Sequence, residues 1–149
     1  MVSQPFTLKL QNCKFYENLA LPHPTYPLTY SGYGGALFGQ SVSLYIENCD
    51  FEKNLALTGQ FDAGSGGGAI SVENCKPVSI QQTRFLNNGA VGLFTVSSFS
   101  QPGSGGALYS KFSAVNITDN CVFEKNWVSA GGAAPAVGGA IACNTIVSS

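Results

Sequence analysis

The side chains that could do chemistry are few, because the 149 residues include eight acids, five cysteines and one histidine. Polysaccharide lyases and hydrolases need clustered carboxylates, which hold calcium or act as general acid and base. Here the acids are dispersed. Glu52 and Glu124 occupy one position of a recurring segment, and Glu17 stands where Lys53 and Lys125 stand in related segments. We therefore expect Glu17 and Lys53 to pair on the surface, and we predict no catalytic site.

The histidine and the cysteines do not form a pattern typical of a metal or nucleophile site. His23 lies in "LALPHPTYPLTYSGY", with no nucleophile and acid partner indicated, so we interpret it as a loop residue. There is no Cys-x-x-Cys, and one histidine is too few for the usual zinc sets. The sequence predicts no metal and no cofactor.

Three cysteines share one position of the recurring segment, two residues before a phenylalanine. They are Cys13, Cys49 and Cys121, and Thr83 takes the same position in the third segment. We interpret them as small inward side chains that stack, because unpaired cysteine is often buried. A Cys13–Cys49 disulfide between neighbouring strands is the alternative. Cys75 and Cys143 fall outside this position.

These residues recur because two motifs alternate along the chain. One is Gly-Gly-Ala followed by Leu or Ile, and the other is Phe-x-x-Asn, whose phenylalanines are 36, 34 and 38 residues apart. A period of this length is typical of a solenoid, propeller or array. The Phe-x-x-Asn residues are Phe15, Asn18, Phe51, Asn54, Phe85, Asn88, Phe123 and Asn126.

The hydrophobic pattern around each phenylalanine predicts short strands joined by corners. Apolar residues alternate before it, as at Leu44 and Ile46, which places them on one face of a strand. The alternation changes parity near Asn48 and again between Phe and Asn, so the chain must turn there. Gly-Gly permits a third corner. We therefore predict an all-β parallel β-helix of about four coils, formed by one unit over residues 1–149, with Phe and Asn stacked in columns.

The alternation of Gly-Gly-Ala-(Ile/Leu) with Phe-x-x-Asn resembles the repeats of the chlamydial polymorphic outer membrane proteins. Similar repeats occur in autotransporter-like adhesins and in algal and protist surface proteins. The likeness covers nearly the whole chain, with four matches to each motif. It implies a right-handed parallel β-helix exposed at a cell surface, acting in adhesion or as a stalk. The Asn-Cys-x-Phe variant departs from the chlamydial form.

The stretch between Asn and the next Gly-Gly varies in length, which is typical of loops. These stretches span 19–33, 55–66, 89–104 and 127–137. They could bind a host-cell or matrix protein or a surface glycan, or they could pack as a hydrophobic flank. A pectate lyase-like enzyme or carbohydrate-binding module is the alternative function. The aromatic residues of these stretches are Tyr26, Tyr30, Tyr33, Phe61, Phe94, Phe99 and Trp127.

Charge and hydropathy argue against several classes of partner. The net charge is −1 without a basic run, which argues against nucleic acid and anionic membranes. No apolar stretch reaches the 18 or more residues of a membrane span. We expect an extracellular segment of a longer array, whose unpaired terminal strands favour end-to-end self-association. Asn116-Ile117-Thr118 is a glycosylation sequon, but Ile117 is expected in the core, which disfavours its use.

Overall fold

The computed structural model describes residues 6–22, 32–58, 66–92, 104–129 and 138–144, and these contain strands and turns but no helix. The strands form four parallel sheets of four strands each. We name them sheet A (β1-β5-β9-β13), sheet B (β2-β6-β10-β14), sheet C (β3-β7-β11-β15) and sheet D (β4-β8-β12-β16). Among the described residues, no helix is long and apolar enough to cross a membrane.

Each repeat contributes one strand to every sheet, in the order A, B, C, D. Repeat 1 holds β1 (Thr7–Gln11), β2 (Lys14–Tyr16), β3 (Leu19–Ala20) and β4 (Leu37–Gln40). Repeat 2 holds β5 (Ser43–Glu47), β6 (Asp50–Glu52), β7 (Leu55–Thr58) and β8 (Ile70–Glu73). Repeat 3 holds β9 (Val78–Gln81), β10 (Arg84–Leu86), β11 (Gly89–Gly92) and β12 (Leu108–Lys111). Repeat 4 holds β13 (Val115–Thr118), β14 (Val122–Glu124), β15 (Trp127–Ser129) and β16 (Ile141–Asn144).

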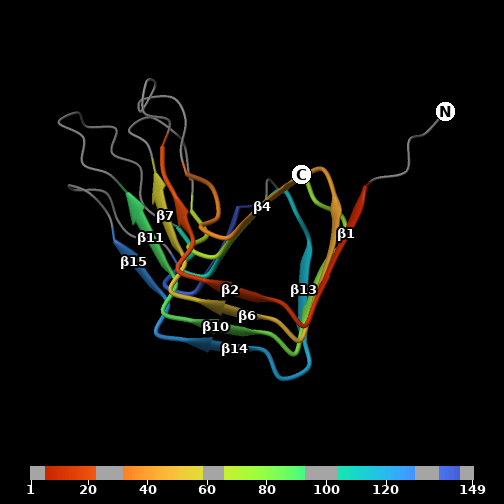
Figure 1. Cartoon of the computed structure of the whole chain (residues 1–149). Coiled ribbons are helices and arrows are strands. Elements are labelled where there is room, and N and C mark those ends of the chain that lie inside the picture. Colours follow the sequence, from red (N-terminus) through yellow and green to blue (C-terminus); the bar gives the residue numbers. More distant parts are fainter. Residues whose placement is uncertain (1–5, 23–31, 59–65, 93–103, 130–137, 145–149) are drawn as a thin grey trace.

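Equivalent residues of successive repeats are paired in register, as the sequence predicts. Phe85 lies between Phe51 and Phe123, and Phe51 lies beside Phe15. Figure 1 shows the strands of sheet B one above another, with sheet A and sheet C rising as walls on either side. The expectation of an all-β chain with parallel strands is therefore confirmed.

The corners between sheets are formed by residues with left-handed backbone angles. Asn48 has φ 49° between sheets A and B, Lys53 has φ 55° between B and C, and Gly67 has φ 71° before sheet D. These match the three predicted corners. A fourth corner, which we did not predict, joins sheet D to sheet A at Asn74, φ 53°. Ser41 and Phe112 take the same conformation in their repeats.

Close backbone approach explains why the Gly-Gly pair recurs. A Cβ on Gly67 would lie 1.9 Å from the carbonyl oxygen of Ile70, and a Cβ on Gly68 would lie 2.0 Å from that of Gly106. Neither position can hold a side chain without moving the backbone. The alanine that follows, Ala69, is fully buried. The motif is therefore a requirement of the corner and not a ligand site.

The core lies between the four sheets and is completed in the two middle repeats. Leu44, Phe51, Ile80 and Phe85 are at most 1% exposed, whereas the equivalent residues of repeats 1 and 4 are partly buried. The four phenylalanine rings form a continuous stack, with centroids 4.6, 5.1 and 4.7 Å apart and ring planes within 7° of parallel. Phe51 and Phe85, each stacked between two other rings, are the largest fully buried side chains of the core.

Candidate functional site

The asparagine column is a continuous chain of hydrogen bonds. Asn54 donates from its backbone N and from Nδ2 to Oδ1 of Asn88, at 3.0 and 2.9 Å. Asn88 makes the same two bonds to Asn126, at 3.0 and 2.9 Å. The second amide hydrogen of Asn88 binds the carbonyl oxygen of Phe51, at 2.9 Å. Both central asparagines are fully buried, so these polar groups serve the scaffold and do not face a ligand.

The cysteine position is also an internal hydrogen-bonding column. The backbone N of Cys13 donates to Sγ of Cys49, at 3.4 Å, and that of Cys49 donates to Oγ1 of Thr83, at 3.3 Å. The thiol of Cys49 donates to the carbonyl oxygen of Glu47, at 3.2 Å. Burial raises the pKa of the Cys49 thiol. All five cysteines are free, so the structure contains the stacked thiols and not the disulfide alternative.

Cys75 has the equivalent role at the fourth corner, which sequence reasoning missed. It follows Asn74 as Cys49 follows Asn48, and its backbone N donates to Oγ of Ser113, at 2.8 Å. Its thiol donates to the carbonyl oxygen of Gly39, at 3.3 Å. The signal was present, because Asn-Cys occurs at four corners of the chain. Cys143 stands apart and is exposed.

Most of the described acids of the outer faces are engaged in ion pairs. Arg84 Nε lies 3.0 Å from Asp50 Oδ1, and this hydrogen bond raises the pKa of the guanidinium. Lys53 Nζ lies 2.7 Å from the hydroxyl of Tyr16, which raises the pKa of the amine, and 3.6 Å from Glu17. The predicted Glu17–Lys53 pair is thus confirmed. Within the described ranges, no group of three or more His, Cys, Asp or Glu could hold a metal ion. His23 lies outside those ranges.

Two of the seven predicted loop aromatics are described. Tyr33 stacks on Phe38, with centroids 4.9 Å apart, and is half-buried. Trp127 is 44% exposed, and its ring packs against Gly89 of the neighbouring repeat, where a Cβ would be 2.4 Å from the ring. The two residues belong to the first and the last repeat, so the structure does not bring them together. The others, which lie outside the described residues, are Tyr26, Tyr30, Phe61, Phe94 and Phe99.

The outer face of sheet C is largely apolar. Ala56 and Ala90 are fully buried, so alternation points their neighbours outward. No strand of sheet C contains a charged residue. Three of the outward side chains are strongly exposed, Leu19 at 54%, Leu21 at 59% and Trp127 at 44%. We define the sheet C face by its apolar outward residues, Leu19, Leu21, Leu55, Leu57, Val91 and Trp127. The exposed Ser129, which pairs with Val91, is a polar residue at the edge of this face.

The sheet C face is formed by the first residues of the four stretches of variable length, because β3, β7, β11 and β15 begin at residues 19, 55, 89 and 127. The prediction that these stretches are loops throughout was therefore wrong at their starts. β7, β11 and β15 lie side by side (Figure 1), and their carboxyl ends are where the described ranges break. The sequence predicted where these stretches begin. It could not show that their first residues form a single sheet with a largely apolar outer face.

Comparisons with known proteins give no neighbour from which a function could be transferred. No protein-family model matches the chain. No curated protein matches it. No solved structure matches it.

Proposed function

We propose that the chain is a right-handed parallel β-helix, exposed at a cell surface, which binds a partner without catalysing a reaction. The in-register pairing of all four repeats is the observation that carries this proposal. A solenoid of this kind presents long outer faces at fixed spacing, which suits a stalk or an adhesive surface. The resemblance to polymorphic outer membrane protein repeats supports the right-handed sense and the extracellular location.

The sheet C face is the surface that we assign to the partner. Exposed Trp and Leu side chains on one uncharged face lose water when an apolar partner surface covers them, and tryptophan is enriched among residues that dominate binding energy. The outer face of sheet B is less suited to an apolar partner, because it contains charged side chains such as Arg84 and Asp50, which form an ion pair with each other. We therefore propose that the partner is a protein with an apolar contact patch, such as a host-cell or matrix protein.

Binding to immobilised collagen, fibronectin and laminin and to cultured epithelial cells tests this function. Trp127→Ser should weaken binding about 30-fold, since truncation of a tryptophan that dominates an interface costs about 2 kcal/mol or more. Val122→Ser is the matched control, because Val122 is 46% exposed on sheet B. Equal losses in both variants, or no binding to any of these targets, would contradict the proposal.

Two further measurements test the remaining parts of the proposal. Incubation with pectin and alginate, with and without calcium, should give no cleavage; turnover lost in a single acid-to-alanine variant would establish the enzymatic alternative. A crystal structure should show the chain advancing in a right-handed sense from repeat to repeat, and a left-handed path would refute that assignment.

A further inference from the structure

The outer face of sheet A contains a polar groove, separate from the sheet C face. Its volume is about 510 Å³, within the range of about 300–1,000 Å³ that is usual for small-molecule sites. It crosses three repeats and is open to solvent. It is lined by residues of β1, β5 and β9, namely Thr7, Lys9, Tyr45, Ile46, Glu47, Ser79 and Gln81.

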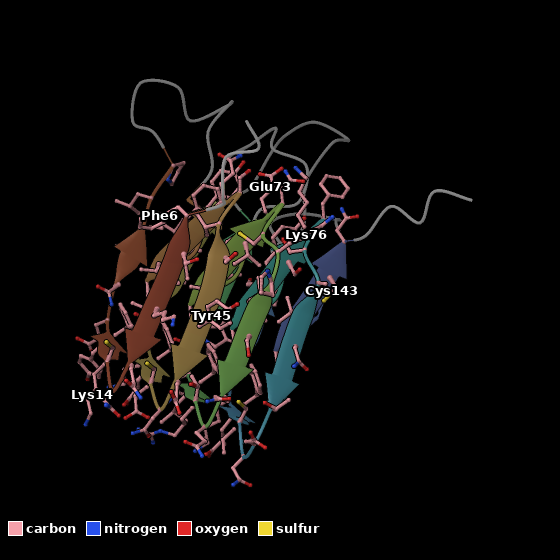
Figure 2. All side chains as sticks on the ribbon, turned by 90° about the vertical axis from the view of Figure 1, so that its right-hand side faces the viewer. Phe6, Lys14, Tyr45, Glu73, Lys76 and Cys143 are labelled. Carbon is pink, nitrogen blue, oxygen red and sulfur yellow. The ribbon has the colours of Figure 1, made fainter. Side chains whose placement is uncertain are left out.

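Register places a tyrosine at the centre of this groove. Lys9, Tyr45 and Ser79 are paired across the three strands, and their neighbours along each strand are core residues, so these three side chains point outward. Figure 2 faces this sheet and shows Tyr45 near its middle. Glu47 and Gln81 form a second paired row toward the end of the strands.

The groove combines a flat ring with both kinds of hydrogen-bonding group. Tyr45 is 39% exposed, and Lys9 Nζ lies 5.8 Å from the centroid of its ring. Glu47 Oε2 accepts a hydrogen bond from Gln11 Nε2 at 3.1 Å, which holds the carboxylate at the edge of the groove. Ser79 and Gln81 are half-buried and can each donate and accept.

The smaller groove on sheet B differs in its charge. It measures about 240 Å³, and its lining includes Arg84, Asp50 and Glu52. Arg84 lies 3.0 Å from Asp50 and 3.9 Å from Glu52. A ligand would have to break these ion pairs to reach the charges. On sheet A, by contrast, most of the polar groups are neutral, and the one cation and one anion balance in net charge.

We propose that the sheet A groove binds a neutral, unbranched oligosaccharide. The C–H face of a sugar ring packs against an aromatic ring, and sugar hydroxyls both donate and accept, as Ser79, Gln81 and Glu47 require. Because the groove has no excess of positive charge, it does not select uronic or sulfated chains. Two strand spacings give it a length of about 10 Å, which suits a short run of sugar rings.

Isothermal titration with a panel of neutral hexasaccharides tests this proposal. The panel consists of β-1,4-linked glucose, xylose and mannose and α-1,4-linked glucose, with hexagalacturonate and a hyaluronan hexasaccharide as anionic arms. At least one neutral chain should bind, with affinity unchanged between about 50 and about 500 mM salt. Tyr45→Ala should weaken binding about tenfold or more, and Tyr45→Phe should retain most of it.

A second variant keeps the test decisive if Tyr45→Ala unfolds, which circular dichroism would show. Ser79→Tyr should fill the groove and abolish binding while leaving the core intact. Trp127→Ala is the matched control and should leave sugar binding unchanged, so that failure here is distinguishable from failure at the sheet C face. The proposal is overturned if no neutral chain binds, if only the anionic chains bind, or if Trp127→Ala weakens binding as much as Tyr45→Ala.

Discussion

The asparagine column predicts a large difference between two chemically identical substitutions, Asn88→Ala and Asn18→Ala. Asn88 is fully buried, and its side chain makes four hydrogen bonds. Oδ1 accepts from the backbone N and Nδ2 of Asn54, at 3.0 and 2.9 Å. Nδ2 donates to the carbonyl oxygen of Phe51 and to Oδ1 of Asn126, each at 2.9 Å. Asn18 is exposed, and within the described residues its side chain donates one bond, to Asn54 Oδ1 at 2.8 Å.

The expected loss of stability in each variant follows from the number of side-chain hydrogen bonds removed and from how deeply the asparagine is buried. At about 1 kcal/mol net for each hydrogen bond, Asn88→Ala should lower the free energy of unfolding by about 4 kcal/mol. Part of this cost arises because the Phe51 carbonyl and the Asn54 amide stay buried without a partner. Asn18→Ala removes one bond at a solvent-exposed site and should cost about 1 kcal/mol or less.

Urea unfolding followed by circular dichroism gives the two free energies, and hydrogen exchange gives the local effect. The Asn54 amide should lose protection in Asn88→Ala, because Asn88 Oδ1 is its acceptor. Since contacts in a repeat array run between neighbours, amides of repeat 1 should change less than those of repeat 2. Equal destabilisation by the two substitutions, or an unchanged Asn54 amide, would refute the reasoning.

Three further outcomes are expected. Gly67→Ala should cost at least about 2 kcal/mol because of its left-handed φ of 71° and its backbone clash. Gly39→Ala should cost less than about 1 kcal/mol, since its nearest atom would be a side-chain carbon at 3.4 Å; urea midpoints compare the two. Gly89→Ala should displace the single tryptophan, Trp127, and shift its fluorescence emission, and an unchanged spectrum would contradict the packing. Because burial raises the pKa of Cys49, its thiol should alkylate more slowly at about pH 8 than the exposed thiol of Cys143, as mass spectrometry would show. The contribution of the Cys49 thiol to stability should be present below its ordinary pKa and should disappear as pH rises through the raised value, which unfolding at several pH values would check.

The parts of the fold that depend on alternation and parity could be predicted from the sequence. A change in parity forces the chain to turn, which located the corners at Asn48 and Lys53. The fourth corner, at Asn74, was missed because Val72 of β8 and Val78 of β9 are both buried and lie an even number of residues apart. The alternation across this corner therefore shows no net change in parity. The cis peptide bond between Lys76 and Pro77 lies in the same connection.

The candidate surfaces could not be predicted in the same way, because most outward positions do not keep the same residue from repeat to repeat. Lys9, Tyr45 and Ser79 occupy one register position with three different side chains. A groove formed by such a row is visible only when the register is known. Trp127 was predicted as a loop aromatic, but it is the first residue of β15, and its packing on Gly89 depends on a pairing between repeats.

The inward and outward positions of each strand are therefore under different physical constraints. An inward residue contacts its equivalents on both sides, so a change at Phe85 or Asn88 disturbs two neighbouring repeats at once. An outward residue such as Tyr45 meets solvent and one row of neighbours, so it can change without disturbing the stack. This difference explains why one scaffold can have an apolar face on sheet C, an ion-paired face on sheet B and a polar groove on sheet A. It also implies that Trp127 and Tyr45 act independently, so the effects of Trp127→Ala and Tyr45→Ala on stability should add within about 0.5 kcal/mol.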